Sequence, residues 1–153
     1  MVQLKEVNQG GFVWCSNYES RKGREISENP HAALLFFWKA LNRQVRIEGF
    51  VQKVTDEESE QYFRSRPREI QISPAVSNQS TVVPGREFLR QQCKELEEKH
   101  PEGSMIPRPR HWGGYRLIPE RFEFWQGDES SVQLRLRYFS ENISGKKEWR
   151  IVQ

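Results

Sequence analysis

Three adjacent residues, Ser20, Arg21 and Lys22, offer a hydroxyl, a guanidinium and an ammonium group in a row. The small polar residue at the start of this stretch and Pro30 just past its end predict a short helix over 20–29. Free backbone N–H groups and the helix dipole favour an anion at a helix start. The three residues could therefore bind a phosphomonoester. The alternative is a solvated helix start without a ligand.

A second pair of residues could bind an anion at the end of another predicted helix. Thr55 and Glu58 have the spacing of a capping box, so a helix should begin there and stop before Pro67. Tyr62 and Arg66 are four residues apart, which places both side chains on one face of this helix end. Both could then reach the same anion, although many surface pairs that bind nothing have this spacing.

The composition indicates one domain of ordinary size with a heavily charged surface. The chain has 153 residues, of which 35% are hydrophobic and 29% charged, and its net charge is +3. This length can bury a core, while the low hydrophobic fraction and the 12% aromatic content also suit a core completed by a partner chain. The small net positive charge is compatible with binding of phosphorylated small molecules or nucleic acid. Because basic and acidic residues are interspersed and no recognition motif occurs, we expect no nucleic-acid partner.

Cysteine and histidine usage gives no sign of a metal site. Cys15 and Cys93 are far apart, and the three histidines form no ligand pattern with them. We expect reduced cysteines and no metal. No apolar stretch approaches transmembrane length, and the N-terminus lacks a signal pattern. We therefore expect a cytoplasmic protein with no membrane partner, or an organellar one if a longer precursor carries a targeting segment.

Short strands with a few helices are predicted for the rest of the chain. Strands are expected over 12–17, 33–38, 43–54, 115–118, 122–126, 132–139 and 149–152, a helix over 86–99, a loop over 69–85, and turns at 118–122 and 142–147. The run 33–38 is apolar throughout, so we expect it to be buried on both faces. Strand 43–54 alternates, with a bulge at Gly49. The pattern is mainly β with helices and favours a small barrel or open sheet.

Several of these segments together resemble one family. They are Asn17–Lys22, Asn42–Gly49, Tyr62–Arg68, Val76–Ser80 and Trp112–Gly127. They resemble the pyridoxamine (pyridoxine) 5′-phosphate oxidases, FMN enzymes that make pyridoxal phosphate, and the likeness covers nearly all of residues 2–150. The resemblance implies an FMN-binding split β-barrel that forms a homodimer with its active site at the interface. It implies a split-barrel region over 1–100 and a C-terminal dimerisation region over 110–153.

The resemblance also implies roles for individual residues. Those implied for FMN binding are Cys15, Ser16, Ser20, Arg21, Lys22, Gln44, Gln79, Ser80, Trp125 and Arg135. The last four would reach the FMN of the neighbouring subunit, and Gln44 would contact the edge of the flavin ring. Those implied for the substrate phosphate are Lys5, Tyr62 and Arg66. Without the resemblance, Gln44 would be interpreted as an exposed strand residue and Trp125 as a core residue.

Four differences from the family pattern concern activity. Family members usually have further N-terminal residues, including a phosphate-binding arginine just before the position of Met1. The family's Arg-Leu-His-Asp-Arg run aligns with residues 131–135, where only Arg135 is kept, and the lost residues orient the pyridoxine ring. Ile70 replaces a serine of the substrate-phosphate loop, and residues 73–74 replace a Gly-Ala pair. The family's terminal Arg-Leu-Ala-Pro is missing after Trp149-Arg150-Ile151.

These differences fall on the substrate residues more than on the flavin residues. An isoleucine cannot donate a hydrogen bond to a phosphate, and a poorly oriented ring should slow hydride transfer. We therefore expect oxidation of pyridoxamine or pyridoxine 5′-phosphate to pyridoxal 5′-phosphate, with FMN as cofactor, dioxygen as acceptor and weakened activity. The alternative is a degenerate or truncated paralogue that keeps FMN binding or dimerisation without oxidase activity.

Overall fold

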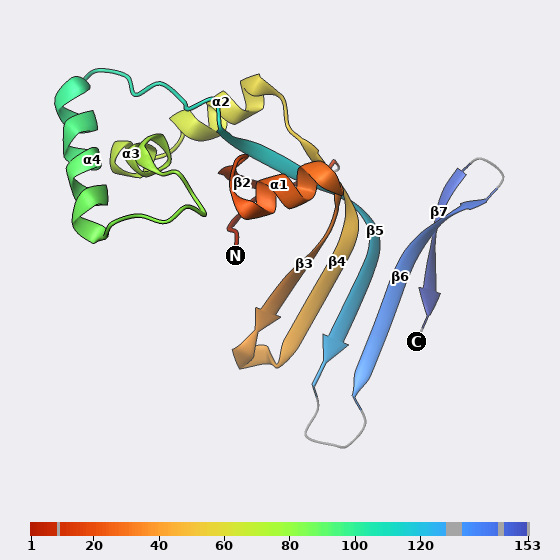
Figure 1. Ribbon diagram of the computed structural model, residues 1–153. Coiled ribbons are helices and arrows are strands. Elements are labelled where there is room, and N and C mark those ends of the chain that lie inside the picture. The colour runs from red at the N-terminus through yellow and green to blue at the C-terminus, as the bar shows by residue number, and fades with distance from the viewer. Residues whose placement is uncertain (9, 128–132, 144–145, 153) are drawn as a thin grey trace.

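The structure is a computed structural model that describes residues 1–8, 10–127, 133–143 and 146–152. Within these residues, seven antiparallel strands form one sheet and four α-helices flank it (Figure 1). The strands are β1 (Leu4–Asn8), β2 (Gly11–Asn17), β3 (His31–Trp38), β4 (Arg43–Lys53), β5 (Trp112–Gln126), β6 (Leu134–Ile143) and β7 (Lys146–Val152). The helices are α1 (Arg21–Glu28), α2 (Asp56–Arg64), α3 (Arg68–Val76) and α4 (Arg86–Lys99), with a short 3-10 helix η1 (Lys39–Leu41).

The long strand β5 connects the two ends of the molecule. Along one edge it pairs with β4, and along the other edge its first half pairs with β2 and its second half with β6. The sheet order is β1-β2-β5-β4-β3, and β7 extends it beyond β6. Figure 1 shows α3 and α4 side by side at one end of the molecule and the β6–β7 hairpin on the opposite side. The start of β5 therefore lies among the helices, and its end lies among the outer strands.

Strand β5 is one continuous element, so the predicted turn at 118–122 is wrong. The register between β4 and β5 shifts between Glu48 and Gly49, which leaves Glu120 as the extra residue of a bulge. A bulge tolerates Pro119, which has no backbone N–H to donate. The predicted irregularity at Gly49 is confirmed. An added Cβ there would lie 2.0 Å from the carbonyl oxygen of Ile118, so the close approach of the two strands requires glycine.

Helix α3 replaces the first half of the loop predicted over 69–85, so that prediction is wrong for residues 69–76. The segment contains Pro74, which removes one backbone hydrogen bond from the helix. The helix is stabilised by packing, because Ile72 is buried in a cluster with Phe63 and Trp112. This contact joins residues that are far apart in the sequence, and local composition does not reveal it.

The core consists of two clusters on either side of the start of β5. Trp14, Ile47, Val51, Tyr115 and Leu117 form one cluster on the sheet, and the other lies under the helices. The prediction that β3 is buried on both faces is wrong for the single chain. Its residues alternate, and Leu35 and Phe37 are 64% and 55% exposed. Because β3 is an edge strand with one face on the core, its other face stays uncovered.

The remaining predicted strands and helices are confirmed within a few residues. Strand β6 begins at Leu134, and residues 128–132 lie outside the described part of the chain. Of the turn predicted over 142–147, residues 142–143 belong to β6 and 146–147 to β7, so the turn is shorter than predicted, and residues 144–145 lie outside the described residues.

Candidate functional site

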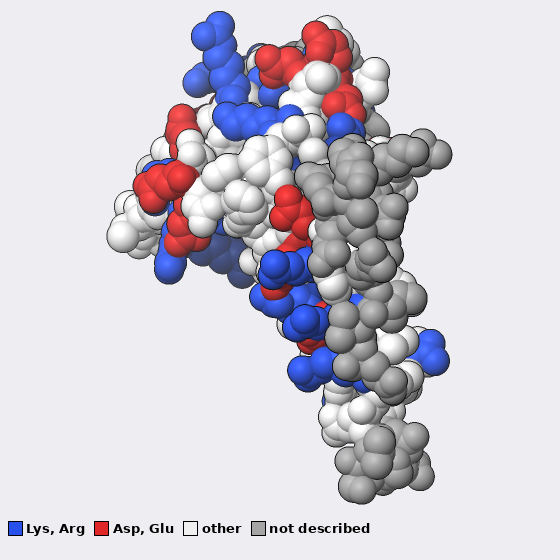
Figure 2. All heavy atoms as spheres, turned by 90° about the vertical axis from the view of Figure 1, so that its right-hand side faces the viewer, with Lys and Arg blue, Asp and Glu red and all other residues white. Residues whose placement is uncertain are grey.

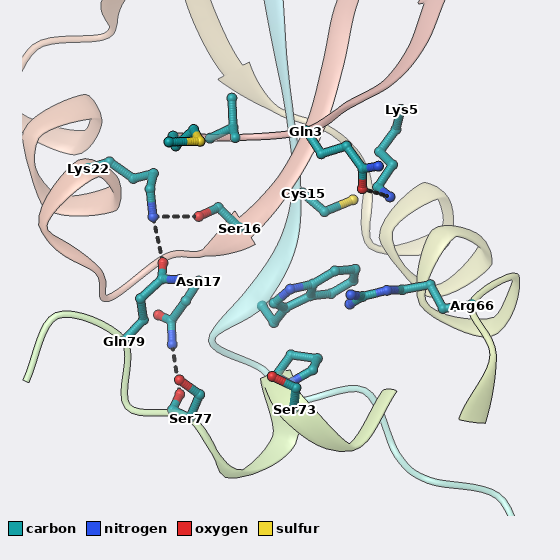
Figure 3. A pocket seen from close by; sticks show the side chains of 14 residues that line it. Gln3, Lys5, Cys15, Ser16, Asn17, Lys22, Arg66, Ser73, Ser77 and Gln79 are labelled. Carbon is teal, nitrogen blue, oxygen red and sulfur yellow. Dashed lines mark hydrogen bonds between the residues drawn. The ribbon is translucent and has the colours of Figure 1, made fainter. Parts of the chain in front are cut away.

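A pocket of about 410 Å³ opens where β1, β2, the start of β5 and the end of α3 meet (Figure 3). Its lining residues include three cations, Lys5, Lys22 and Arg66, and no carboxylate. We call it the cationic pocket. The other lining residues are Met1, Val2, Gln3, Cys15, Ser16, Asn17, Ser73, Pro74, Ser77, Gln79 and Trp112. Three positive charges without a lining counter-charge make the pocket electrostatically suited to an anion.

Helix α1 positions Lys22 at one end of this pocket. Ser20 caps the helix: its buried hydroxyl accepts from the Gly23 backbone N–H at 3.3 Å and donates to the Asn17 carbonyl at 2.7 Å. The Lys22 ammonium group donates to Ser16 Oγ at 3.1 Å and to Gln79 Oε1 at 2.5 Å. Partial burial lowers the pKa of Lys22. Lys22 also donates to Ser20 Oγ at 3.3 Å, so three neutral acceptors hold this partly desolvated ammonium group, whose charge suits an anion.

Arg21 points away from the pocket. Its guanidinium pairs with Glu25 at 2.8 Å on the surface, and its side chain is 82% exposed. Its backbone N–H instead donates to Ser80 Oγ at 3.1 Å. Of the three adjacent residues singled out in the sequence, Lys22 thus lines the pocket, Ser20 builds the helix start and Arg21 lies outside.

The loop after α3 brings Gln79 and Ser80 against α1 of the same chain. Asn17 helps to fix this loop, because its side-chain amide donates to the Ser77 carbonyl at 3.3 Å. Ser80 has a positive φ of 69°, which allows the chain to turn sharply there. A contact of this pair with a flavin of the neighbouring subunit stays a prediction.

Arg66 and Lys5 lie at the other end of the cationic pocket. The Arg66 guanidinium lies over the Trp112 ring, 5.0 Å from Cζ to the ring centroid. Its Nε and Nη1 atoms are buried and have no hydrogen-bond partner among the described residues. Desolvation lowers the pKa of Arg66. Lys5 donates to Gln3 Oε1 at 2.7 Å, and the Cys15 thiol lies between the two ends of the pocket (Figure 3).

Tyr62 does not line the pocket. Helix α2 ends at Arg64, so Tyr62 and Arg66 do not continue along one helix face as predicted. The Tyr62 hydroxyl donates to the carboxylate of Glu6 on β1. Burial, and then this bond, raise the pKa of Tyr62 to about 12. A contact of Tyr62 with the substrate stays a prediction.

The remaining predicted flavin residues form a second group on the sheet. Gln44 on β4 lies opposite Trp125 on β5, and Trp125 lies opposite Arg135 on β6. We call these three residues the sheet-face group. Arg135 lies 3.7 Å from Glu123, and the group borders a hollow of about 180 Å³. This hollow shares no lining residue with the cationic pocket, so one chain holds the predicted flavin residues in two separate places.

Only some of the positions that differ from the family pattern lie at the cationic pocket. Ser73 and Pro74 line the cationic pocket, whereas Ile70 is exposed and does not. Residues 131–132 lie outside the described residues, and Gln133 accepts a hydrogen bond from the Trp125 indole at 3.0 Å.

The contact between Trp112 and Arg66 was not predicted from the sequence. Trp112 precedes two glycines that fit tightly: a Cβ added to Gly113 would lie 2.0 Å from the Tyr18 hydroxyl. A large aromatic residue followed by two glycines indicates that another part of the chain approaches this backbone closely. This pattern is the signal in the sequence that points to a packed position for Trp112.

Two further observations concern possible partners. Among the described helices, none is long and apolar enough to cross a membrane, and the described residues hold no cluster of three or more potential metal ligands. On the side shown in Figure 2, basic side chains lie beside acidic ones over much of the described surface. This mixed distribution differs from the continuous basic patch that is typical of nucleic-acid binding.

Comparisons with known proteins place the chain in a family. Residues 1–100 match the family model described as pyridoxamine 5′-phosphate oxidase, and residues 112–153 match the pyridoxine 5′-phosphate oxidase C-terminal dimerisation region. The chain is 54% identical to the chloroplastic pyridoxine/pyridoxamine 5′-phosphate oxidase 1 of Arabidopsis thaliana, over 99% of this chain and 28% of that protein. It is 49% identical to the pyridoxine/pyridoxamine 5′-phosphate oxidase of Burkholderia thailandensis, over 100% of this chain and 70% of that protein.

Solved structures confirm the split-barrel fold. PhzG from Burkholderia lata, solved with tetrahydrophenazine-1-carboxylic acid, superposes with a TM-score of 0.86 at 29% identity, over 99% of this chain and 73% of that one. An FMN-binding protein from Nostoc punctiforme, described as related to pyridoxamine 5′-phosphate oxidase, has the same fold, with a TM-score of 0.67 at 12% identity, over 99% of this chain and 78% of that one. The chain spans 28% and 64% of the lengths of the Arabidopsis and Trichormus variabilis relatives. With both family models matched over nearly its whole length, the chain belongs to the pyridoxamine 5′-phosphate oxidase family.

Proposed function

We propose that this chain binds FMN and oxidises pyridoxamine or pyridoxine 5′-phosphate to pyridoxal 5′-phosphate, with dioxygen as the electron acceptor. The cationic pocket carries this proposal, because it gathers Lys5, Lys22 and Arg66 without a lining carboxylate. The cofactor and the substrate are both phosphomonoesters, and such groups need several positive donors. The names of relatives at 49–54% identity support the same activity.

The end of the pocket at Lys22 suits the FMN phosphate. The Lys22 ammonium has three protons and donates to Ser16, Ser20 and Gln79, and it can exchange these neutral partners for phosphate oxygens. Among the described residues Arg21 forms an ion pair with Glu25 alone, which is exposed, and such a surface pair is weak enough to open when a phosphate binds nearby. Ser20 keeps the helix start formed, Cys15 lines the wall, and Ser80 holds the Arg21 backbone.

We propose that the sheet-face group of one chain serves the flavin bound by a second copy. In one chain, Gln44, Trp125 and Arg135 border a hollow that is separate from the cationic pocket. A homodimer with its active site at the interface would bring both places together. The dimerisation model over 112–153 and the exposed apolar residues of β3 support this arrangement.

FMN, when bound, supplies the hydride acceptor for the substrate carbon that bears the amine or alcohol. The chain's own residues bind and orient. Lys5 and Arg66 bind the substrate phosphate, and Trp112 holds Arg66 in place through ring stacking. The Tyr62–Glu6 bond and the exposed position of Ile70 leave this phosphate with fewer donors, which favours weakened activity or the alternative of a non-oxidising FMN-binding paralogue.

We place the protein in the cytoplasm or, by analogy with the relative named chloroplastic, in an organelle.

Flavin titration tests this function. Quenching of FMN fluorescence should give tight binding to the unaltered chain, and Lys22→Ala should weaken it by about ten-fold or more. Arg24→Ala is the matched control, because Arg24 is an exposed cation of the same helix outside the pocket. Formation of pyridoxal 5′-phosphate in air then tests turnover. Absence of FMN binding would overturn the proposal, and binding without turnover would favour the paralogue.

Mixing two damaged chains tests the shared site. If each flavin site draws on two chains, Lys22→Ala and Trp125→Ala chains mixed at random should regain about a quarter of the intact sites, because half of the dimers are mixed and each has one undamaged site. If both groups served the flavin of their own chain, mixing would restore nothing.

A further inference from the structure

Arg108 joins helix α2 to the start of β5 outside the cationic pocket. Its guanidinium donates to Asp56 Oδ1 at 2.6 Å and to Glu60 Oε2 at 3.2 Å, both on α2. It also donates to the backbone carbonyl of Trp112, the first residue of β5, at 2.7 Å. The Arg108 side chain is 12% exposed and does not line the pocket. Because a guanidinium is planar and rigid, these bonds fix α2 and the start of β5 relative to each other.

The two partners of the Arg66–Trp112 stack are attached to these same two elements. Arg66 follows the last residue of α2 by two positions, and its backbone N–H donates to the Phe63 carbonyl of α2 at 3.3 Å. Its Cζ atom lies 5.0 Å from the Trp112 ring centroid, and its Nε and Nη1 atoms are buried without a hydrogen-bond partner among the described residues. Figure 1 shows α2 beside the start of β5, and Figure 3 shows Arg66 pointing toward the pocket. The position of Arg66 over the ring therefore depends on how α2 packs against β5.

The charge of Arg108 is already balanced by its own partners. Asp56 and Glu60 supply two carboxylates for one guanidinium, so these three residues present no net positive charge to an anion. Ion pairs withdrawn from water also gain little net stability, because desolvation offsets the attraction between the charges. What these three residues provide is a fixed geometry between two elements.

We propose that Arg108 is a positioning residue: by bonding α2 to the Trp112 carbonyl, it holds the Arg66 guanidinium over the Trp112 ring, where it binds a phosphate in the pocket. The inference rests on the proposed function, in which Arg66 binds the substrate phosphate. Arg108 itself touches neither the phosphate nor FMN. The two acids on α2 then support anion binding through geometry, which is the reverse of the direct effect of their charges.

The test is an equilibrium titration of the full chain with pyridoxine 5′-phosphate, with FMN kept reduced and dioxygen excluded so that no turnover occurs. Arg108→Met and the double variant Asp56→Ala/Glu60→Ala should each weaken binding about two- to ten-fold, because Arg66 loses its fixed position. The double variant decides between geometry and charge, since removal of two negative charges would by itself tighten the binding of a phosphate dianion. The matched controls are Glu57→Ala, an exposed acid of α2, and Arg110→Met, an exposed cation outside the pocket, and both should bind normally.

A second comparison separates positioning from a purely structural role. In an Arg66→Met background, R108M should weaken binding no further, because Arg108 acts through Arg66. R108M should lower the melting temperature by about 2–4 °C in both backgrounds, because its bonds to α2 and β5 are lost whether or not Arg66 is present. A purely structural role would lower the melting temperature in the same way, but its effect on binding would not depend on Arg66.

Tighter binding in D56A/E60A would overturn the inference, and so would an R108M loss of affinity that persists without Arg66. If R108M does not fold, D56A/E60A in both backgrounds gives the same comparison, because Arg108 is kept. If the unaltered chain does not bind pyridoxine 5′-phosphate, the proposed function falls and the inference with it. Normal binding that R108M and D56A/E60A leave unchanged removes the inference alone.

Discussion

Replacing Arg66 by methionine should stabilise the unliganded chain and weaken its binding of phosphate ligands. Two of the guanidinium nitrogens are buried without a hydrogen-bond partner among the described residues. Desolvation lowers the pKa of this group, as expected where burial disfavours the charged form. The Trp112 ring stacks on it but supplies no acceptor. The free protein therefore carries a desolvation cost that a bound anion would relieve.

The size of this cost follows from the contacts. A buried donor without a partner costs about 1–3 kcal/mol, and stacking on an aromatic ring offsets about 0.5–1 kcal/mol of that. The rest of the Arg66 side chain is in contact with water, so we expect a net gain of about 1 kcal/mol in Arg66→Met after allowance for screening. In a domain of this size, that gain raises the melting temperature by about 2–4 °C. The lost charge-assisted bond should weaken phosphate binding about 10- to 100-fold.

Thermal melting with and without pyridoxine 5′-phosphate measures both effects. The matched control is Arg64→Met, two residues earlier, where an exposed arginine pairs with Glu60 at 2.7 Å. A surface pair of this kind contributes at most about 0.5 kcal/mol, so the control should melt at or slightly below the temperature of the unaltered chain and bind normally. A lower melting temperature for Arg66→Met without ligand, together with an unchanged shift on adding ligand, would refute the reasoning.

Three further outcomes are expected. Gly113→Ala should destabilise the fold by about 1–3 kcal/mol in urea, because the new Cβ would lie 2.0 Å from the Tyr18 hydroxyl, and unchanged stability would contradict that packing. Thr55→Ala should cost about 1 kcal/mol by removing the capping box of α2, whereas Thr55→Ser should restore it. Burial raises the pKa of Cys15 to about 11, so in a Cys93→Ser chain alkylation should accelerate about ten-fold per pH unit from pH 7 to 9, and a plateau in that range would contradict the assignment.

Elements with local signals could be predicted from the sequence. The capping box at Thr55 and the helix cap at Ser20 are both formed as expected, because each depends on residues within one helical turn. Strand β4 alternates as its sequence does, with Ile47 and Val51 buried. In these elements, the side chains that decide the structure are close together in the chain.

Elements decided by distant contacts could not be predicted in the same way. Pro74 and its polar neighbours favour a loop, but burial of Ile72 against residues from α2 and β5 stabilises a helix. Pro119 favours a turn, but pairing along β4 carries the strand through with a bulge. In both cases, tertiary packing overrides a local signal that was interpreted correctly for an isolated segment.

The candidate site shows the same division. Lys22 and Arg66 both line the cationic pocket, Lys22 from helix α1 and Arg66 from the link between α2 and α3, and their roles toward FMN and substrate stay predictions. The geometry of Tyr62 was missed because its hydroxyl is bound by Glu6, a residue of an edge strand with no motif of its own. Spacing along one helix cannot reveal a partner that a different strand supplies.

Four residues form a row across one face of the sheet, and in a single chain this face is uncovered. Phe37 on β3 lies opposite Gln44, which lies opposite Trp125, which lies opposite Arg135, so the register places all four on one face. Phe37 is 55% exposed, and water is a poor neighbour for its ring. An amide, an indole and a guanidinium beside an exposed aromatic ring form a surface suited to a flat polar ring system such as a flavin. The cations that we propose to bind phosphate line a separate pocket of the same chain, which is why we propose that a second chain presents its own pocket to this row.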